Sequence, residues 1–292
     1  MSTSTTAACY ADRAWHGSVP ILENTRLARD TYRVRLAAPE IARRIVPGQF
    51  IMLRLAGCDD PLLARPLAMY ETIDDEAGQP AAIDVVYLVV GKMTGRLAHC
   101  IAGQRLEVWG PLGNGFPLHE TGHVVMVAGG IGQTPFLALA REFLGQRRYG
   151  LRESPLASRV TLCYGARAAD LLAGVEDFRA AGVDVRISTD DGSAGHHGLV
   201  TDLLQTVLDE DVSGEQPDIR IVCCGPEKMM AAVASLAANR QVPCEVSLET
   251  PMACGIGICF SCVARVRDDQ GTWDYRRTCV EGPIFDAARL VF

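Results

Sequence analysis

The pattern of hydrophobic residues along the chain changes near residue 120. Before that point, short apolar runs that alternate or are rich in β-branched residues predict strands at residues 31–36, 47–55, 83–90 and 105–109. Only residues 94–101 have a helical pattern there. Several short strands separated by turn residues are typical of a small antiparallel barrel.

After residue 120 the apolar runs are continuous and alternate with helical stretches. The first is HVVMVAGG (residues 123–130), and further strands are predicted at 160–166, 183–189 and 220–225. Helical patterns fall between or after them, at 134–146, 171–181, 201–208 and 227–239. Strands that are apolar throughout and alternate with helices indicate a parallel sheet covered on both faces.

The sequence therefore predicts a β plus α/β fold with three parts. These are an N-terminal antiparallel β-barrel, a central parallel-sheet α/β domain and a short cysteine-bearing segment. We place an N-terminal extension at residues 1–18, the barrel at 19–120, the α/β domain at 121–247 and the last segment at 248–292. That segment is too short for an independent ferredoxin domain, so a bound cluster must help it to fold.

Composition and charge exclude several classes of function. The chain has 292 residues, of which 48% are hydrophobic and 22% charged, as in ordinary globular proteins. Its net charge of −7 argues against a nucleic-acid partner or an anionic membrane surface. No apolar run approaches the ~20 residues of a membrane span. The start of the chain lacks the pattern of a secretory signal.

Eleven cysteines, an odd number scattered through a chain of this length, do not resemble a disulfide scaffold. They predict a reducing compartment, the cytoplasm. Four of them follow the order C-x4-C-x2-C, then 16 residues and a fourth cysteine, at Cys254, Cys259, Cys262 and Cys279. This order is that of plant-type [2Fe–2S] sites rather than of zinc ribbons, although a structural zinc site is an alternative. Gly255 and Gly257 let the backbone wrap closely around such a cluster.

Two strand ends in the α/β domain carry glycines that fit nucleotide binding. The loop GGIGQTP lies between a strand and a helix, where glycines allow close approach and helix N–H groups attract phosphate. Its candidate residues are Gly129, Gly130, Gly132, Thr134 and Pro135. A second strand ends in Cys224, Gly225 and Pro226, at the edge where open α/β sheets bind ligands. Plain strand–turn–helix joints are the alternative interpretation of both.

Two segments of the barrel offer further candidates. Arg65, at the start of the run RPLA, has a guanidinium suited to a pyrophosphate. The Tyr87 ring can stack on a flat ligand, and Thr94 with its helix-start N–H groups can hold phosphate. Taken alone, Tyr87 is more often a barrel residue and Thr94 a helix cap.

The order of these motifs resembles the ferredoxin–NADP reductase superfamily. With the cysteine loop, the chain resembles the electron-transfer subunits of NAD-dependent two-component dihydroorotate dehydrogenases. The similarity extends from about residue 19 to the end. The most specific segments are GPLGNGF (110–116), STDDGS (188–193), MACGIGICFSC (252–262) and RRTCVEGPIF (276–285).

The resemblance implies FAD in the barrel, NADH on the α/β domain and a [2Fe–2S] cluster on the four cysteines. NADPH is an alternative to NADH. By position, the flavin contacts are Arg65, Pro66, Leu67, Ala68, Val86, Tyr87, Leu88, Met93 and Thr94. Two departures weaken individual contacts: Ala68 stands where serine is usual, and Met93 where glycine is common.

The resemblance also implies a mechanism and a partner. Electrons pass from NADH through FAD and the cluster to an FMN-containing catalytic subunit, most plausibly a dihydroorotate dehydrogenase of pyrimidine biosynthesis, in a hetero-oligomer. No acid–base residue is needed, so we assign no catalytic role to His99, His119, His123, His196 or His197. The alternatives are a stand-alone NAD(P)H diaphorase or flavin reductase, a subunit of a different oxidoreductase, and a non-catalytic redox sensor.

Overall fold

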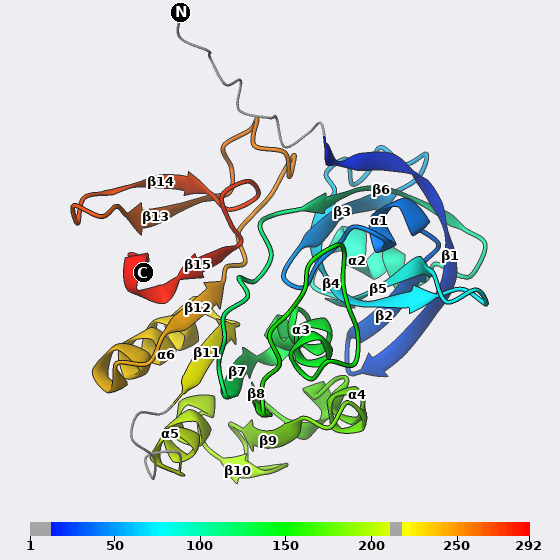
Figure 1. Ribbon diagram of the computed structural model, residues 1–292. Helices are drawn as coiled ribbons and strands as arrows, with labels where there is room; N and C mark the ends of the chain where they lie inside the picture. The colour runs from blue at the N-terminus through cyan, green and yellow to red at the C-terminus, as the bar shows by residue number, and fades with distance from the viewer. Residues whose placement is uncertain (1–12, 211–217) are drawn as a thin grey trace, which may run out of the picture.

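The computed structural model describes residues 13–210 and 218–292. It contains a closed β-barrel, a seven-stranded sheet with helices on both faces, and a small C-terminal segment (Figure 1). The predicted fold class is therefore confirmed. The proposed N-terminal extension lies mostly in residues 1–12, outside the described residues.

The barrel closes in the strand order β1-β2-β5-β4-β3-β6. Alternate side chains such as Val34, Ile51 and Val85 fill its interior and are fully buried. Two short helices, α1 (Pro39–Ala42) and α2 (Lys92–Leu97), belong to this part of the chain. The six strands are β1 (Trp15–Ala28), β2 (Thr31–Leu36), β3 (Phe50–Leu55), β4 (Arg65–Asp74), β5 (Pro80–Leu88) and β6 (Arg105–Leu112).

The sequence patterns located four of these strands directly and the start of β4. They missed β1, whose polar residues break the alternation. Residues Trp15 to Ser18 pair with β6, so the barrel begins four residues before the boundary that we placed at residue 19.

The second sheet has the order β10-β9-β8-β7-β11-β12-β15. All neighbouring strands are parallel except β15, which is antiparallel to β12. Its strands are β7 (His123–Gly129), β8 (Arg159–Ala166), β9 (Asp184–Thr189), β10 (His196–His197), β11 (Ile219–Cys224), β12 (Cys244–Ser247) and β15 (Ile284–Asp286). Apolar side chains are buried on both faces, as parallel strands require.

Helices cover both faces of this sheet. The helices α3 (Phe136–Phe143) and α4 (Val175–Ala180) pack on the face turned toward the barrel. The other face is covered by α5 (Val200–Glu210) and α6 (Glu227–Arg240). None of the helices in the described part of the chain is long and apolar enough to cross a membrane.

The C-terminal segment is joined to both larger parts. Its strand β15 completes the sheet, and the hairpin of β13 (Val263–Arg267) and β14 (Trp273–Arg277) lies at the outer edge of the molecule (Figure 1). Asn114, in the linker between the barrel and the sheet, donates to the carbonyl of Ile284 (2.8 Å) and accepts from its N–H (3.1 Å). The linker therefore contacts the C-terminal segment directly.

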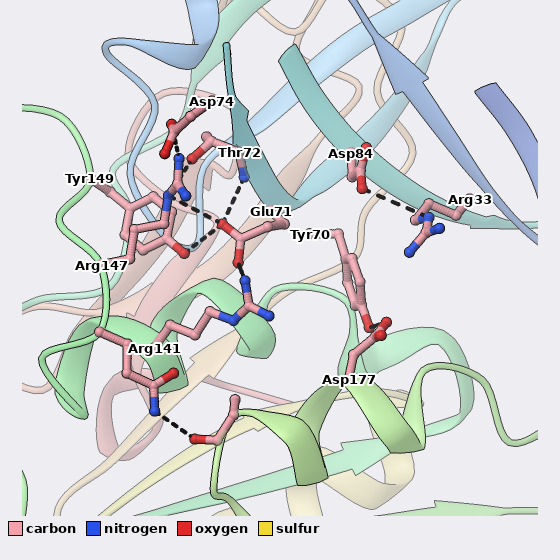
Figure 2. A network of polar contacts seen from close by, with 12 residues as sticks. Arg33, Tyr70, Glu71, Thr72, Asp74, Asp84, Arg141, Arg147, Tyr149 and Asp177 are labelled. Carbon is pink, nitrogen blue, oxygen red and sulfur yellow. Dashed lines mark hydrogen bonds and ion pairs between the residues drawn. The ribbon is translucent and has the colours of Figure 1, made fainter. Parts of the chain in front are cut away.

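A buried polar network joins the barrel to the α/β domain (Figure 2). The Glu71 carboxylate on β4 accepts hydrogen bonds from the Tyr149 hydroxyl (2.6 Å) and from Arg141 on α3 (2.7 Å). Next to it, the Tyr70 hydroxyl donates to Asp177 on α4 (2.7 Å). Burial raises the pKa of Glu71, while Tyr149, the Thr72 N–H and the two neighbouring arginines oppose that shift. A buried carboxylate is tolerated only with such partners.

We predict that Tyr149→Phe destabilises the junction of the two domains. The substitution removes one hydrogen bond to a buried carboxylate, which costs about 1–3 kcal/mol. Thermal unfolding should show a lower midpoint. Tyr32→Phe is the matched control, because the Tyr32 hydroxyl makes no hydrogen bond to a described residue while its ring stacks on Tyr87. Equal midpoints for the two variants would contradict the importance of this contact.

Candidate functional site

The start of β4 presents alternate side chains to two environments. Leu67 packs against the barrel interior. Pro66 and Ala68 lie opposite Met52 and Phe50 of β3, and cross-strand partners share one face of a sheet. Because Met52 and Phe50 pack in a cluster with Cys262 and Cys279, this outer face of the barrel adjoins the cysteine segment.

At the end of β5, alternate side chains also point to two different environments. Val86 is buried in the core that the barrel shares with the α/β domain. Tyr87 points the other way, into the barrel, where its hydroxyl donates to Asn24 (3.0 Å) and its ring stacks on Tyr32. Strand alternation turns the Tyr87 ring inward, as in the alternative interpretation of Tyr87 as a barrel residue, so a ligand contact at this position would involve its peptide groups. Leu88, the last residue of β5, is half-buried.

The remaining barrel candidates lie at loop and helix starts. Arg65 donates to the carbonyls of Leu63 and Ala64 and has no carboxylate partner among the described residues, which leaves charge available for an anion. The Thr94 hydroxyl accepts from the N–H groups of Val90 (3.1 Å) and Gly91 (3.3 Å), so it closes the turn before α2.

Met93 is buried in the barrel core. Its side chain is thus turned away from the outer surface of the turn before α2. The departure from glycine at this position therefore places no side chain on that surface.

The two glycine-bearing strand ends of the α/β domain fit directly against each other. A methyl group at Gly132 would collide with the Cys224 carbonyl and lie 2.8 Å from the Gly225 nitrogen. A methyl group at Gly129 would lie 2.6 Å from the Met229 sulfur and 2.8 Å from Pro226. The glycines are therefore required by the close approach of the ends of β7 and β11.

The other residues of these loops lie at the same carboxyl edge. Gly130, with φ +56°, has open space around it. Thr134 is buried, and Pro135 directly precedes α3, while Pro226 directly precedes α6. Burial raises the pKa of the Cys224 thiol to about 12, so it stays neutral.

Buried polar atoms without protein partners mark this edge of the sheet. Both amide atoms of Gln133 and the hydroxyl of Ser188 are buried and have no hydrogen-bond partner among the described residues. Buried polar groups are normally satisfied, so exceptions call for an explanation such as a bound ligand or water. Sequence reasoning did not single out either residue. The available signal was that Gln133 lies in the loop GGIGQTP and that Ser188 begins the segment STDDGS.

Two of the four cysteines of the C-terminal segment, Cys262 and Cys279, lie side by side although they are distant in sequence. The sulfurs of Cys262 and Cys279 are 3.2 Å apart and buried. Cys259 is exposed, and hydrogen bonds from Ser261 and, less strongly, from Cys254 lower its pKa to about 6. Burial, followed by the neighbouring Cys262, raises the pKa of Cys279 to about 12, and Cys254 contributes in the same direction.

The thiols are thus arranged as the pairs Cys254–Cys259 and Cys262–Cys279. Among the described residues, no three or more metal-ligating side chains converge as a single-ion site would require. The order C-x4-C-x2-C…C of these thiols is that of a two-iron cluster with four cysteine ligands. The residues present are consistent with the predicted [2Fe–2S] centre.

Close contacts fix the cysteine loop on the barrel. Gly255 has φ +73°, and a methyl group there would lie 2.5 Å from Met52 on β3. The Trp109 indole N–H on β6 donates to the Cys254 carbonyl (3.0 Å). Gly257 has φ +82° and accepts a hydrogen bond at its carbonyl from Arg277 (2.9 Å). Sequence reasoning identified the two glycines but missed Met52 and Trp109, whose role arises only in the folded chain.

Comparison with known proteins agrees with this geometry. Family models match residues 18–116 as an oxidoreductase FAD-binding domain and 126–235 as an oxidoreductase NAD-binding domain. The chain is similar to a structure of an NADH-dependent reduced ferredoxin-NADP oxidoreductase, with 27% identity, a TM-score of 0.75 and coverage of 94% of this chain and 89% of that one. The fold and the matched domains therefore define an oxidoreductase of the ferredoxin reductase type.

A third family model, the iron-sulfur cluster binding domain of dihydroorotate dehydrogenase B, matches residues 249–291. The chain is 36% identical to the dihydroorotate dehydrogenase B (NAD(+)) electron transfer subunit of Shouchella clausii, covering 96% of this chain and 99% of the relative. It is 34% identical to the corresponding subunit of Desulforamulus reducens, covering 91% and 94%. The chain belongs to the family of dihydroorotate dehydrogenase B electron transfer subunits.

We predict that Gly132→Ala impairs nucleotide binding. The added methyl group must push the ends of β7 and β11 apart, so the KM for NADH should rise at least tenfold. The measurement is steady-state reduction of ferricyanide by NADH. Gly130→Ala is the control in the same loop, because open space surrounds that position and only the backbone strain of a positive φ, roughly 1–2 kcal/mol, is added. A larger effect at Gly130 than at Gly132 would contradict the packing argument.

Proposed function

We propose that this protein is the electron-transfer subunit of a two-component dihydroorotate dehydrogenase. It links NAD(H), through FAD and a [2Fe–2S] cluster, to an FMN-containing subunit that oxidises dihydroorotate in pyrimidine biosynthesis. The support is the family membership together with one structural observation. The outer face of β3 and β4 contacts the cysteine segment, and the end of β5 contacts the α/β domain.

The chain's own residues divide the work of binding. Pro66 and Ala68 offer side chains outside the barrel interior for a flat ring, while on β5 Val86 is buried against the α/β domain and the peptide groups of Tyr87 and Leu88 follow it. Arg65 and the turn at Met93 and Thr94 would hold the anionic part of FAD. Ala68 supplies no hydroxyl, so any hydrogen bond to the flavin at this position must come from the peptide backbone.

The strand ends at Gly129–Thr134 and Cys224–Pro226 would hold NADH. Their role is to orient the nicotinamide toward the outer face of the barrel, and the neutral Cys224 thiol adds no charge there. A bound flavin exchanges hydride with nicotinamide and single electrons with an iron–sulfur centre. The protein fixes the positions of these groups and supplies no acid–base residue.

The relay operates in both directions. Oxidation of dihydroorotate by the partner releases electrons. These electrons then enter at the cysteine loop and reduce NAD+ to NADH. An excess of NADH drives the opposite flow, from the nucleotide to the partner, and is the condition used in the tests below. The exposed Cys259, flanked by the exposed side chains of Ile258 and Phe260, is the natural point of exchange.

We also assign the protein to the cytoplasm. The ten described cysteines are all free thiols, as expected in a reducing compartment. A hetero-oligomer with the catalytic subunit follows from the proposed function, since the relatives are named as electron transfer subunits.

The first test is the visible spectrum of anaerobically purified protein before and after addition of NADH. We expect flavin bands and broad iron–sulfur absorption, both bleached by NADH. Addition of the FMN-containing subunit and orotate should restore the colour. A colourless protein with stoichiometric zinc would overturn the proposal. Rapid reduction of free flavin with no response to the partner would favour a stand-alone reductase.

The second test is Cys259→Ala. It should abolish the iron–sulfur absorption and electron exchange with the partner, because one of four ligands is lost. NADH-dependent bleaching of the flavin should be largely retained, since the flavin-binding residues belong to other elements. Cys58→Ala, which removes a thiol outside the cysteine loop, is the control and should leave both signals intact. Loss of both signals in Cys259→Ala would contradict the proposed division of labour.

A further inference from the structure

The hairpin of β13 and β14 has one face that is covered at Val266 and one face that is open along its length. On the covered face, Val266 is buried and pairs with Leu290 near the C-terminus. Directly opposed residues of an antiparallel pair lie on the same face of the two strands. The register of β13 and β14 therefore shows which residues lie on the face opposite Val266. We call it the arginine–aromatic face; it consists of Val263, Arg265, Arg267, Trp273, Tyr275 and Arg277.

Arg265, Trp273 and Tyr275 of this face contact one another, and Arg277 joins the face to the cysteine loop. The rings of Trp273 and Tyr275 meet edge to face with centroids 5.4 Å apart. The Arg265 guanidinium lies 5.8 Å from the Trp273 ring centroid. Trp273 and Tyr275 are 46% and 56% exposed, which is unusual for large aromatic side chains on one face of a strand pair.

The charge of the face differs in sign from that of the whole chain. The face holds three arginines and no carboxylate, whereas the net charge of the protein is −7. Arg265 and Arg267 form no ion pair with any described residue. The ion pair of Arg277 is long, with 3.8 Å between its Nε and a carboxylate oxygen of Glu281. Arginine, tryptophan and tyrosine are the residues enriched at the energetic centres of protein interfaces.

The face is continuous with the cysteine loop. The Arg277 guanidinium lies 5.2 Å from the centroid of the Phe260 ring, and Phe260 directly follows the exposed Cys259. A protein seated on the arginine–aromatic face would therefore also approach the thiol loop. Figure 1 shows the hairpin at the periphery, where such a partner has access.

We propose that the arginine–aromatic face docks the FMN-containing catalytic subunit, which meets it with carboxylates and apolar side chains. This inference rests on the proposed function and adds the surface and its chemistry. The arginines supply charge complementarity and speed association, whereas the aromatic pair supplies buried area. Because the exposed arginine charges are screened by salt, affinity should fall as ionic strength rises.

The test measures the affinity of the cofactor-loaded protein for the purified dihydroorotate dehydrogenase subunit of the same organism by titration calorimetry. We expect the double variant Arg265→Glu/Arg267→Glu to weaken binding at least tenfold and to reduce its salt dependence. Trp273→Ala should weaken binding at least tenfold without changing the salt dependence. Reduction of ferricyanide by NADH should stay unchanged in both variants, which shows that they are folded.

The matched control reverses two arginines elsewhere on the surface, Arg43→Glu/Arg148→Glu. Both are more than half exposed, and their ion pairs are long, at 3.9 and 3.7 Å. Equal weakening in this control, or unchanged binding in the hairpin variants, would overturn the inference. So would a wild-type protein that oxidises NADH but does not bind the subunit. Absence of flavin and iron–sulfur absorption would instead overturn the proposed function.

Discussion

The hydrogen bonds of Asn114 join the linker between the barrel and the sheet to the C-terminal segment. Its amide both donates to and accepts from the backbone of Ile284, and its own N–H donates to the Gly282 carbonyl (2.7 Å). Gly113 fits beside it only because it lacks a side chain, since a methyl group would lie 2.6 Å from Pro283. One short linker thus fixes the C-terminal segment against the connection between the barrel and the sheet. The distance between the cysteine loop and the other candidate sites depends on this contact.

Rigid placement matters because the candidate sites come from distant parts of the chain. The cysteine loop contacts the barrel through Met52, and the barrel contacts the α/β domain through Tyr70 and Glu71. Each junction combines apolar burial with a few directional hydrogen bonds, which gives both stability and a defined geometry. Electron exchange between bound groups needs such geometry more than it needs reactive side chains. The buried His123, for example, forms a hydrogen bond with Thr161 (2.9 Å).

The sequence was sufficient for the fold class, but not for the orientation of every candidate residue. Periodicity predicted β2 and the alternating strands and helices because those segments have uniform patterns. It missed β1 and β12, whose pairing depends on strands far away in the chain. It also placed Tyr87 beside a ligand, although strand alternation, counted from Val86, turns the ring inward. Contacts such as Met52 against Gly255 could not be predicted, because neither residue carries a local signal of the other.

The small size of the C-terminal segment accounts for its exposed face. A two-stranded hairpin has little apolar surface with which to cover itself, and an isolated one is marginally stable. Here Leu290 pairs with the buried Val266 on one face, and the bound cluster would stabilise the loop that precedes the hairpin. The other face then remains open, with aromatic rings stabilised by arginines rather than by a core. A partner that covers this face would stabilise the segment. It would also shield the thiols of the cysteine loop from solvent. Docking and protection of the cluster would therefore be one event.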